Sequence, residues 1–224
     1  MKERAQKAPK KLAPQQARSR ESLRKLQKAT AEVLGQHGVE GTTIPRIAQH
    51  AGLTPGAIYR RFHDKDALLE ATILGILERQ EERMKTGLTP AAAAQIPLTV
   101  FAEQVIGGMV LSYRVNAALL RAMRSFAQNR QQSPFGKKVS RLEARTFGQV
   151  VELFMAHSKD VKHPNPRAAI SLGIMMVSSR LVDWVVMAQD VGVWKQFLPK
   201  DDQQLKRELT RAFLSYLGVE QKTN

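Results

Sequence analysis

The sequence contains no cysteine among its 224 residues. This absence excludes disulfides, zinc–thiolate sites and cysteine nucleophiles, and it is compatible with a reducing compartment, so we expect a cytoplasmic protein. The chain also has no apolar run near its start: residues 1 to 22 are polar and basic, which predicts no signal peptide. No stretch alternates β-branched residues between turn signals. We therefore expect an all-α fold.

Catalytic and metal-binding patterns are missing as well. The sequence has no GxSxG, no Walker loop and no GxGxxG, and its five histidines form neither HExxH nor a pair four residues apart. His157 and His163 flank a loop, where we interpret them as solvated side chains and keep chelation as the alternative. Glu81 and Glu82 lie near Arg79 and Arg83 and indicate a charged helix face rather than an acid/base pair. We predict no enzyme activity, no metal and no cofactor.

Positive charge is what the chain has in excess. The formal net charge is +15; residues 1 to 65 hold 14 Lys/Arg against 5 Asp/Glu, and the other 159 residues hold 21 against 15. A surplus concentrated in the first part favours a polyanionic partner. Residues 1–19 have few apolar side chains and two prolines, which predicts a disordered basic arm. The arm follows phosphates or enters a minor groove, or else it is a solvated tail; both interpretations stay open.

Residues 41–65 predict two short helices joined by a tight turn. Residues 43–51 place their apolar side chains at helical spacing. Gly52 breaks this helix, and we expect Leu53 to turn back into the core. Thr54 is a suitable N-cap for a second helix that begins at Pro55 and runs to about Phe62.

The second of these helices has an unusual outward face. Ile58 and Phe62, four residues apart, define its buried side, and Gly56 and Arg60 fall opposite them. Small residues and arginine let a helix approach another molecule closely and donate hydrogen bonds, as a helix-turn-helix does in the DNA major groove. An ordinary helical hairpin with a solvated basic face is the alternative.

The rest of the chain reads as helices separated by short breaks. We expect a first helix at residues 20–36 and a connecting helix at 64–85, followed by a loop at 86–97. Later helices are predicted at residues 98–114, 116–130, 136–156, 166–191 and 201–217. The predicted architecture is an N-terminal three-helix helix-turn-helix domain plus a C-terminal helical bundle, about nine helices in total. The expected division is a basic arm at 1–19, a DNA-binding domain at 20–65, a connecting helix at 66–85 and an effector-binding and dimerisation domain at 86–224.

Residues 168–193 form the most apolar stretch. Arg180 and Asp183 lie in its middle, and two ionisable groups at the centre of a bilayer are costly. We therefore interpret it as a bundle helix covered on two sides and predict no membrane association. A buried Arg180 needs an anion, which is either Asp183, three residues away, or an acidic ligand.

Residues 20–75 resemble the N-terminal domain of the TetR family of bacterial transcription regulators. The matching residues are Thr43, Ile47, Ala48, Ala51, Gly52, Leu53, Thr54, Gly56, Tyr59, Phe62, Asp64, Lys65, Leu68 and Leu69. The resemblance implies a homodimeric, sequence-specific DNA-binding regulator, a repressor that a small-molecule effector releases from a palindromic operator. A basic architectural DNA-binding protein without effector is the alternative that the charge alone would support.

The resemblance also implies roles for individual residues. Thr43, Thr54, Tyr59 and Lys65 are expected to anchor phosphates, Pro55, Gly56, Ala57, Arg60 and Arg61 to face base edges, and Pro45 and Arg46 to touch DNA. Pro45 departs from the polar residues sometimes found at its position. Arg60 is the best candidate for specificity, because a bidentate arginine–guanine pair discriminates against a wrong base by about 1–3 kcal/mol.

The resemblance further implies an effector site between the middle helices and a homodimer through residues 166–191 and 201–217. A site for a drug-sized ligand needs large apolar side chains and a few polar groups. The candidates are Phe101, Met109, Tyr113, Met123, Phe126, Phe147, Phe154, Met176, Arg180 and Trp184. For each apolar residue, ordinary core packing is the alternative.

Overall fold

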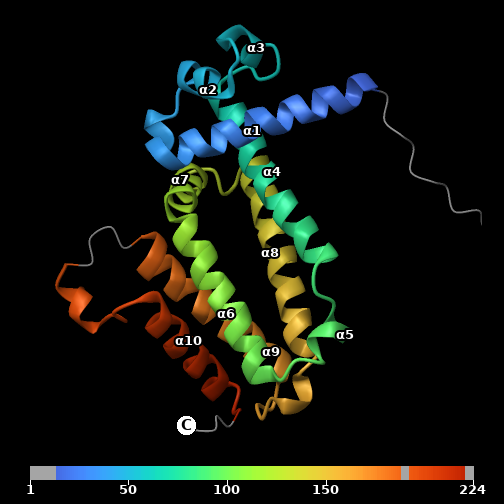
Figure 1. The fold of residues 1–224 in the computed structure, drawn as a ribbon, viewed down its shortest axis with the longest axis vertical. Coiled ribbons are helices and arrows are strands. Elements are labelled where there is room, and N and C mark those ends of the chain that lie inside the picture. The colour runs from blue at the N-terminus through green and yellow to red at the C-terminus, as the bar shows by residue number, and fades with distance from the viewer. Residues whose placement is uncertain (1–13, 188–191, 220–224) are drawn as a thin grey trace, which may run out of the picture.

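The computed structural model describes residues 14–187 and 192–219, which contain ten α-helices and no strand (Figure 1). The all-α fold is thereby confirmed. The α-helices are α1 (Pro14–Gly41), α2 (Ile44–Ala51), α3 (Pro55–Tyr59), α4 (Lys65–Thr86), α5 (Pro90–Ala93), α6 (Leu98–Val115), α7 (Ala117–Gln128), α8 (Pro134–Met155), α9 (Pro166–Leu181) and α10 (Asp202–Tyr216). Nine of them correspond to predicted helices. The tenth, α5, lies in the segment predicted to be a loop, because Thr89 caps a short turn that starts at Pro90.

Helix α1 begins earlier than predicted. It starts at Pro14, so residues 14–19 are helical and the prediction of a disordered arm is wrong there; residues 1–13 lie outside the described residues. A proline at the first helical position is compatible with helix formation because its missing N–H would have no partner there. Gly38, with φ 66°, interrupts the helix near its end, as predicted, and one further helical turn follows to Gly41.

Helices α1, α2 and α3, with the first turns of α4, form a small unit that we call the reading head. Its core consists of Leu26, Val33, Ile44, Ile47, Ala48, Ile58 and Leu68. The expectation that Leu53 joins this core is wrong: its side chain is 37% exposed. Gly52 adopts a left-handed conformation (φ 64°), and the Leu53 N–H donates to Ala48 O at 2.9 Å, so the backbone ends α2 there without burying the side chain.

Helix α4 connects the reading head with the remainder of the chain and begins where it was predicted. The Asp64 side chain accepts a hydrogen bond from the Ala67 N–H at 2.7 Å and caps the helix. Near its other end, buried Glu81 contacts Lys85 at 2.9 Å and Arg145 of α8 at 3.2 Å. The hydrogen bond from Lys85, aided by Arg145, lowers the pKa of the Glu81 carboxyl group. These contacts attach α4 to α8, so the two helices lie side by side.

Helices α6, α8, α9 and α10 make a larger unit, the regulatory bundle, and α7 lies between it and α1 (Figure 1). Its core is centred on Phe101, Phe154 and Phe213. The centre of the Phe154 ring lies 4.8 Å from that of Phe101 and 5.1 Å from that of Phe213. Gly173 in α9 allows α10 to approach, because a Cβ at Gly173 would lie 2.7 Å from the Phe213 ring. His157 is also part of this core at 4% exposure, so its interpretation as a solvated side chain is wrong.

The helix predicted at 166–191 is shorter. α9 ends at Leu181 and continues as a π-helical turn, Val182–Val186; residues 188–191 lie outside the described residues. Among the described residues, Pro166–Val186 is the one helical segment long and apolar enough to cross a membrane, by length and composition alone. It packs against α6, α8 and α10, as a core helix of a bundle does.

Candidate DNA-binding surface and effector region

Helix α3 is built by local signals at both of its ends. The Thr54 side chain accepts a hydrogen bond from the Ala57 N–H at 3.3 Å, and Pro55 occupies the first turn. The α-helix ends at Tyr59, three residues before the predicted end. The Arg61 and Phe62 N–H groups both donate to Ile58 O, at 2.9 and 3.0 Å, which tightens the chain into a turn.

The outward face of α3 carries the residues predicted to read bases. Pro55, Gly56, Arg60 and Arg61 are exposed, whereas Ala57 is half-buried. Nothing lies within 4 Å of a Cβ built at Gly56, so this position faces open space. Within the described part of the chain, the guanidinium groups of Arg60 and Arg61 have no recorded hydrogen bond or ion pair. Both arginines therefore keep their donors available for another molecule.

The predicted phosphate contacts surround this face. Tyr59 is 55% exposed, which leaves its hydroxyl group accessible to another molecule. Thr54 and Thr43 are exposed, and each uses its side-chain oxygen to cap a helix. Oriented N–H groups at the start of a helix favour an anion, so α2 and α3 both begin with a feature suited to phosphate.

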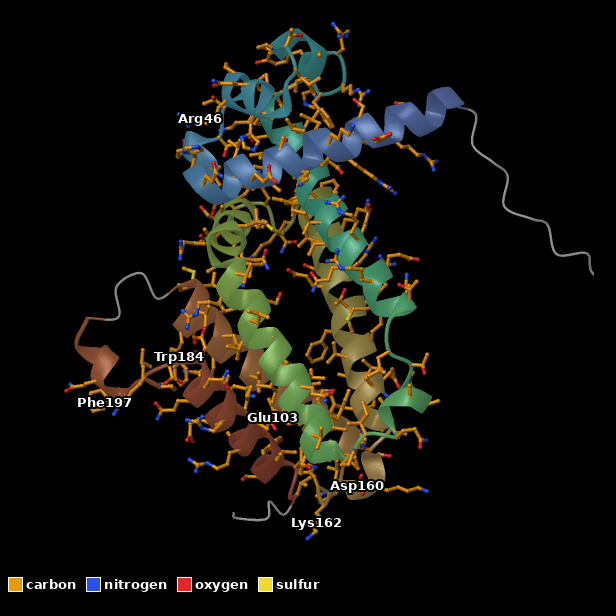
Figure 2. The ribbon with its side chains drawn as sticks, in the orientation of Figure 1. Arg46, Glu103, Asp160, Lys162, Trp184 and Phe197 are labelled. Atoms are coloured by element: carbon orange, nitrogen blue, oxygen red, sulfur yellow. The ribbon has the colours of Figure 1, made fainter. Side chains whose placement is uncertain are left out.

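The start of α2 contributes two further exposed residues, Pro45 and Arg46. The Thr43 oxygen accepts from the Arg46 N–H at 3.4 Å, and the Arg46 guanidinium donates to Gly41 O. Figure 2 shows Arg46 at the end of the molecule formed by the reading head, far from the labelled Glu103 and Trp184 of the regulatory bundle. The structure thus brings the predicted DNA-contacting residues of α2 and α3 to the same end of the molecule.

Lys65 differs from the other predicted phosphate contacts because it has an intramolecular partner. Its ammonium group donates to Val39 O at 3.2 Å, and the side chain is half-buried. Val39 follows the interruption of α1 at Gly38, so Lys65 connects the start of α4 with the end of α1. A phosphate contact by Lys65 stays a prediction.

The ten residues predicted to line an effector site do not form one group. Phe101 and Phe154 are fully buried in ring-to-ring contact, as core residues are. Met123 and Phe126 belong to a separate cluster where α7 packs against α1, α4 and α8. Four of the ten, Met109, Tyr113, Phe147 and Trp184, are half-buried at the edge of the bundle core.

Arg180 and Met176 lie at the surface of α9. The expectation of a buried Arg180 is wrong: its side chain is 53% exposed, and its guanidinium is 3.8 Å from Asp183 Oδ2 and 5.8 Å from the centre of the Trp184 ring. Of the two anions considered, the structure pairs Arg180 with Asp183. Met176 is exposed on the same helix together with Leu172 and Met175.

The sequence did not predict a role for three polar residues near Tyr113, which are Ser178, Glu143 and Arg124. Burial raises the pKa of the Tyr113 hydroxyl group, and Ser178 of α9 lies close enough to oppose this shift in part. Burial also raises the pKa of the Glu143 carboxyl group on α8, and the positive charge of Arg124 on α7 partly opposes the shift. Glu143 and Arg124 are nevertheless both exposed, so the neighbouring helices cover this carboxylate only in part.

Glu143 and Arg124 have no recorded ion pair with any described residue, although each influences the pKa of Tyr113. The signal in the sequence was a carboxylate within an apolar stripe of α8, between Val139 and Val150. No group of three His, Asp or Glu side chains in the described ranges has the arrangement of a metal site.

Comparison with known proteins supports the family that the sequence indicated. The sequence profile described as bacterial regulatory proteins, tetR family, matches residues 26–72, the segment that forms the reading head. This match, together with the relatives and solved structures below, supports the tetR family for this chain. The HTH-type transcriptional regulator BetI of Escherichia coli O45:K1 is a tetR-family relative with 28% identity over 124 residues, covering 54% of this chain and 62% of the relative. BetI of Cronobacter sakazakii is 27% identical over 160 residues, covering 71% and 75%.

Solved tetR-family structures share the fold over most of the chain. A regulator from Mesorhizobium loti superposes with a TM-score of 0.69 at 17% identity, covering 88% of this chain and 97% of that one. FadR of Bacillus subtilis, solved in complex with stearoyl-CoA, has a TM-score of 0.56 at 18% identity, covering 86% and 98%. TetR-family regulators bind DNA operators and small-molecule effectors, typically as dimers, and are generally not enzymes.

Proposed function

We propose that this chain is a sequence-specific DNA-binding transcriptional regulator of the bacterial cytoplasm. In this proposal it is a repressor that leaves a palindromic operator when a small-molecule effector binds. Residues 20–65 form the DNA-binding domain, and residues 66–85 form a helix that connects it to the rest of the chain. Residues 86–224 form the domain that binds the effector and dimerises. The matches to the E. coli BetI sequences span 62% of the length of those relatives. The role of a transcriptional regulator is therefore assigned to this chain as a proposal.

The observation that carries the proposal is the outer face of α3. A short capped helix presents an open Gly56 next to two arginines that have no partner among the described residues. Such a face fits a major groove, where small residues allow close approach and arginine can bond guanine. The excess of positive charge in residues 1–65 adds a sequence-independent attraction to phosphates.

The test is selection of DNA from a random library by the purified protein, followed by footprinting. A repressor of this kind selects a short palindrome and protects it alone. Protection spread along any DNA, with no enriched sequence, would support the architectural alternative and contradict the proposal. Capture of no DNA at low salt would contradict both.

A homodimer through α9 and α10 is part of the proposal. The exposed face of α9 carries Leu172, Met175 and Met176, and Met175 is 53% exposed. Contiguous apolar side chains on a helix surface are typical of an interface. Two reading heads related by a two-fold axis would meet half-sites about 34–36 Å apart or a multiple of this spacing.

Replacing Met175 by glutamate would place charge on this face and should convert the dimer into a monomer in sedimentation velocity. Leu111→Glu is the matched control, because Leu111 is also exposed but lies on α6. Dimers that persist in Met175→Glu, or that are lost in both variants, would contradict the assignment of the interface.

The effector is proposed to bind among α6, α7, α8 and α9. Met109, Tyr113 and Phe147 offer half-buried apolar surface, and Ser178, Glu143 and Arg124 add polar groups near Tyr113. Glu143 and Arg124 are exposed and form no ion pair with a described residue, so both charges are accessible to a ligand, which favours a ligand-binding role. Phe101 and Phe154 support the core beneath.

A thermal-shift screen of small molecules against the wild type and Glu143→Gln tests this site. The panel includes stearoyl-CoA, the compound in the B. subtilis FadR structure. A true effector should raise the melting temperature of the wild type, release DNA, and lose affinity in Glu143→Gln. A compound that releases DNA equally well from both would assign the effector to another part of the bundle.

A further inference from the structure

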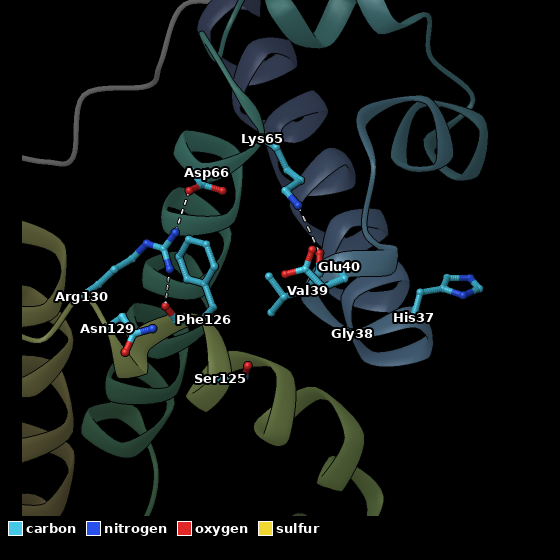
Figure 3. A pocket seen from close by; sticks show the side chains of 10 residues that line it. All are labelled: His37, Gly38, Val39, Glu40, Lys65, Asp66, Ser125, Phe126, Asn129 and Arg130. Atoms are coloured by element: carbon cyan, nitrogen blue, oxygen red, sulfur yellow. Dashed lines mark hydrogen bonds and ion pairs between the residues drawn. The ribbon is translucent and has the colours of Figure 1, made fainter.

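A cavity of about 530 Å³ lies where the reading head meets α7, and its walls hold an ion pair between the two units (Figure 3). The lining includes Val39, Lys65, Asp66, Phe126 and Arg130. Asp66 lies in the first turn of α4, directly after Lys65, and Arg130 lies just beyond the end of α7. Of the residues considered for the effector, Phe126 lines this cavity, whereas Met109, Tyr113 and Phe147 do not.

Arg130 makes three contacts at once. One guanidinium nitrogen donates to Asp66 Oδ2 at 2.7 Å, another donates to Phe126 O at 2.7 Å, and the guanidinium carbon lies 3.9 Å from the centre of the Phe126 ring. Phe126 is fully buried, so the ring is a fixed surface under the cation. The planar guanidinium therefore has a defined orientation, which a flexible lysine would not keep.

The backbone that carries Arg130 is also fixed. Arg130 O accepts hydrogen bonds from the Ser133 N–H at 3.0 Å and from the Ser133 hydroxyl at 2.6 Å. The first turn of α8 packs directly on this segment, since a Cβ at Gly136 would lie 2.1 Å from Arg130 O. One end of the ion pair is thus anchored in the α7–α8 turn, and the other end belongs to the helix that carries the reading head.

Lys65 and Asp66 are neighbours but connect different units. Lys65 donates to Val39 O of α1, so its bond lies within the reading head and moves with it. Asp66 reaches Arg130, so its ion pair spans the boundary between the reading head and the regulatory part of the chain. Figure 3 shows the two side chains diverging from the start of α4, one toward α1 and the other toward Arg130.

We propose that the Asp66–Arg130 ion pair is a latch that sets the orientation of the reading head relative to the regulatory bundle, with Arg130 as a positioning residue for DNA binding. The open cavity next to the pair leaves room for Asp66 to separate from Arg130, while the apolar cluster of α1, α4, α7 and α8 keeps the two units in contact. Arg130 does not touch DNA in this proposal. The expected effect of the ion pair on DNA affinity rests on the proposed function. Its effect on the orientation of the reading head does not.

The experiment measures that orientation directly. Because the chain has no cysteine, cysteines introduced at exposed Gln49 in α2 and exposed Lys159 at the far end of the bundle are the only attachment sites for spin labels. Double electron–electron resonance then gives the distribution of distances between reading head and bundle. Arg130→Met keeps the apolar stem against Phe126 and removes the charge, and Asp66→Asn removes the other partner.

Each single variant should broaden the distance distribution, and the double variant should broaden it no further, because both remove the same contact. Two controls should match the wild type: Lys65→Met, whose bond lies within the reading head, and Arg167→Met, which breaks a 2.6 Å ion pair with Glu152 inside the bundle. Arg130→Lys keeps the charge but cannot donate to Asp66 and Phe126 O at the same time in the same geometry. The width of its distance distribution should fall between those of the wild type and Arg130→Met.

Unchanged distributions in both single variants, or additive broadening in the double variant, would overturn the latch. On the palindrome selected by the wild type, Arg130→Met should bind about three- to tenfold more weakly, as expected for loss of one partly exposed ion pair that preorganises binding. If no palindrome is selected, the proposed function fails while the distance measurement still decides the latch. A broader spin-label distance distribution in Arg130→Met with an unchanged affinity for the palindrome would show that Arg130 does not position the reading head for DNA binding.

Discussion

The reading head and the regulatory bundle differ in the size of their cores and in the unpaired charges that their proposed sites use. The reading head has a small apolar core and exposes Arg60 and Arg61, which have no partner among the described residues. The bundle has an extensive aromatic core, and its proposed site includes an exposed carboxylate, Glu143, which has no ion pair with a described residue and whose pKa is raised by partial burial. A surface that binds a polyanion needs exposed cations, whereas a site that detects a small molecule needs apolar surface and a few polar groups. The comparison indicates that the two units are built for different kinds of ligand.

The largest expected effect comes from the small core of the reading head. Ile58→Ala removes a fully buried side chain beneath the recognition surface and should cost about 2–5 kcal/mol. Because this core is separate from that of the bundle, hydrogen exchange should become faster in α2 and α3 while the bundle keeps its protection. Tyr59→Ala, on the exposed side of the same helix, is the control. Uniform destabilisation of both units would show that they unfold as one.

The bundle side of the comparison is tested at Gly136. The Cβ of Gly136→Ala would meet the backbone oxygen of Arg130 at 2.1 Å, so the turn must shift at a cost of about 1–3 kcal/mol. Gly148→Ala in the same helix has no atom within 4 Å of its new methyl group, and it should be neutral or stabilising by up to about 1 kcal/mol. Thermal unfolding of both variants checks the difference. Equal melting temperatures would contradict the close contact.

A smaller effect is expected at the cap of α3. Thr54→Ala removes the acceptor for the Ala57 N–H and should cost about 0.5–2 kcal/mol, whereas Thr54→Ser keeps the acceptor. The loss should appear as faster amide exchange within α3 in the alanine variant only. Faster exchange in both variants would indicate that the methyl group, and not the hydrogen bond, matters.

The smallest expected effect is on the pH dependence of stability. Burial raises the pKa of Glu143 in the folded state, so in the pH range from the ordinary carboxyl pKa up to the raised one the folded state binds more protons than the unfolded state. Stability must fall as pH rises through that range. Glu143→Gln should reduce this slope and raise the melting temperature at neutral pH. An exposed carboxylate of α4 provides the control, Glu82→Gln. A lower melting temperature in Glu143→Gln would contradict the sign of the shift.

The elements that could be predicted from sequence are those specified by neighbouring residues. Thr43, Thr54 and Asp64 each cap a helix through a contact three residues away, and Gly52 ends α2 with a positive φ, so short-range chemistry locates these boundaries. The start of α1 and the small helix α5 were missed, although both begin at a proline, because a proline in a polar segment also fits a loop.

The effector region could be predicted only in part, because its contacts join distant residues. Tyr113 and Ser178 approach each other across 65 positions of the chain, and outside this region Asp66 pairs with Arg130 across 64 positions. Aromatic residues such as Phe101 and Phe154 fit a core and a ligand site equally well by periodicity. What a helix faces depends on tertiary packing, which no local pattern records, and Arg180 was therefore expected inside when it lies at the surface.

The central claim is that the outer face of α3 reads DNA sequence, and Arg60 tests it most directly. The measurement is the affinity of the wild type and of Arg60→Ala for the selected palindrome and for random DNA at one salt concentration. The account predicts a loss of about 1–3 kcal/mol per half-site on the palindrome and a much smaller loss on random DNA. Equal losses on both would show that Arg60 contacts only phosphate, and the claim that this face reads bases would be contradicted.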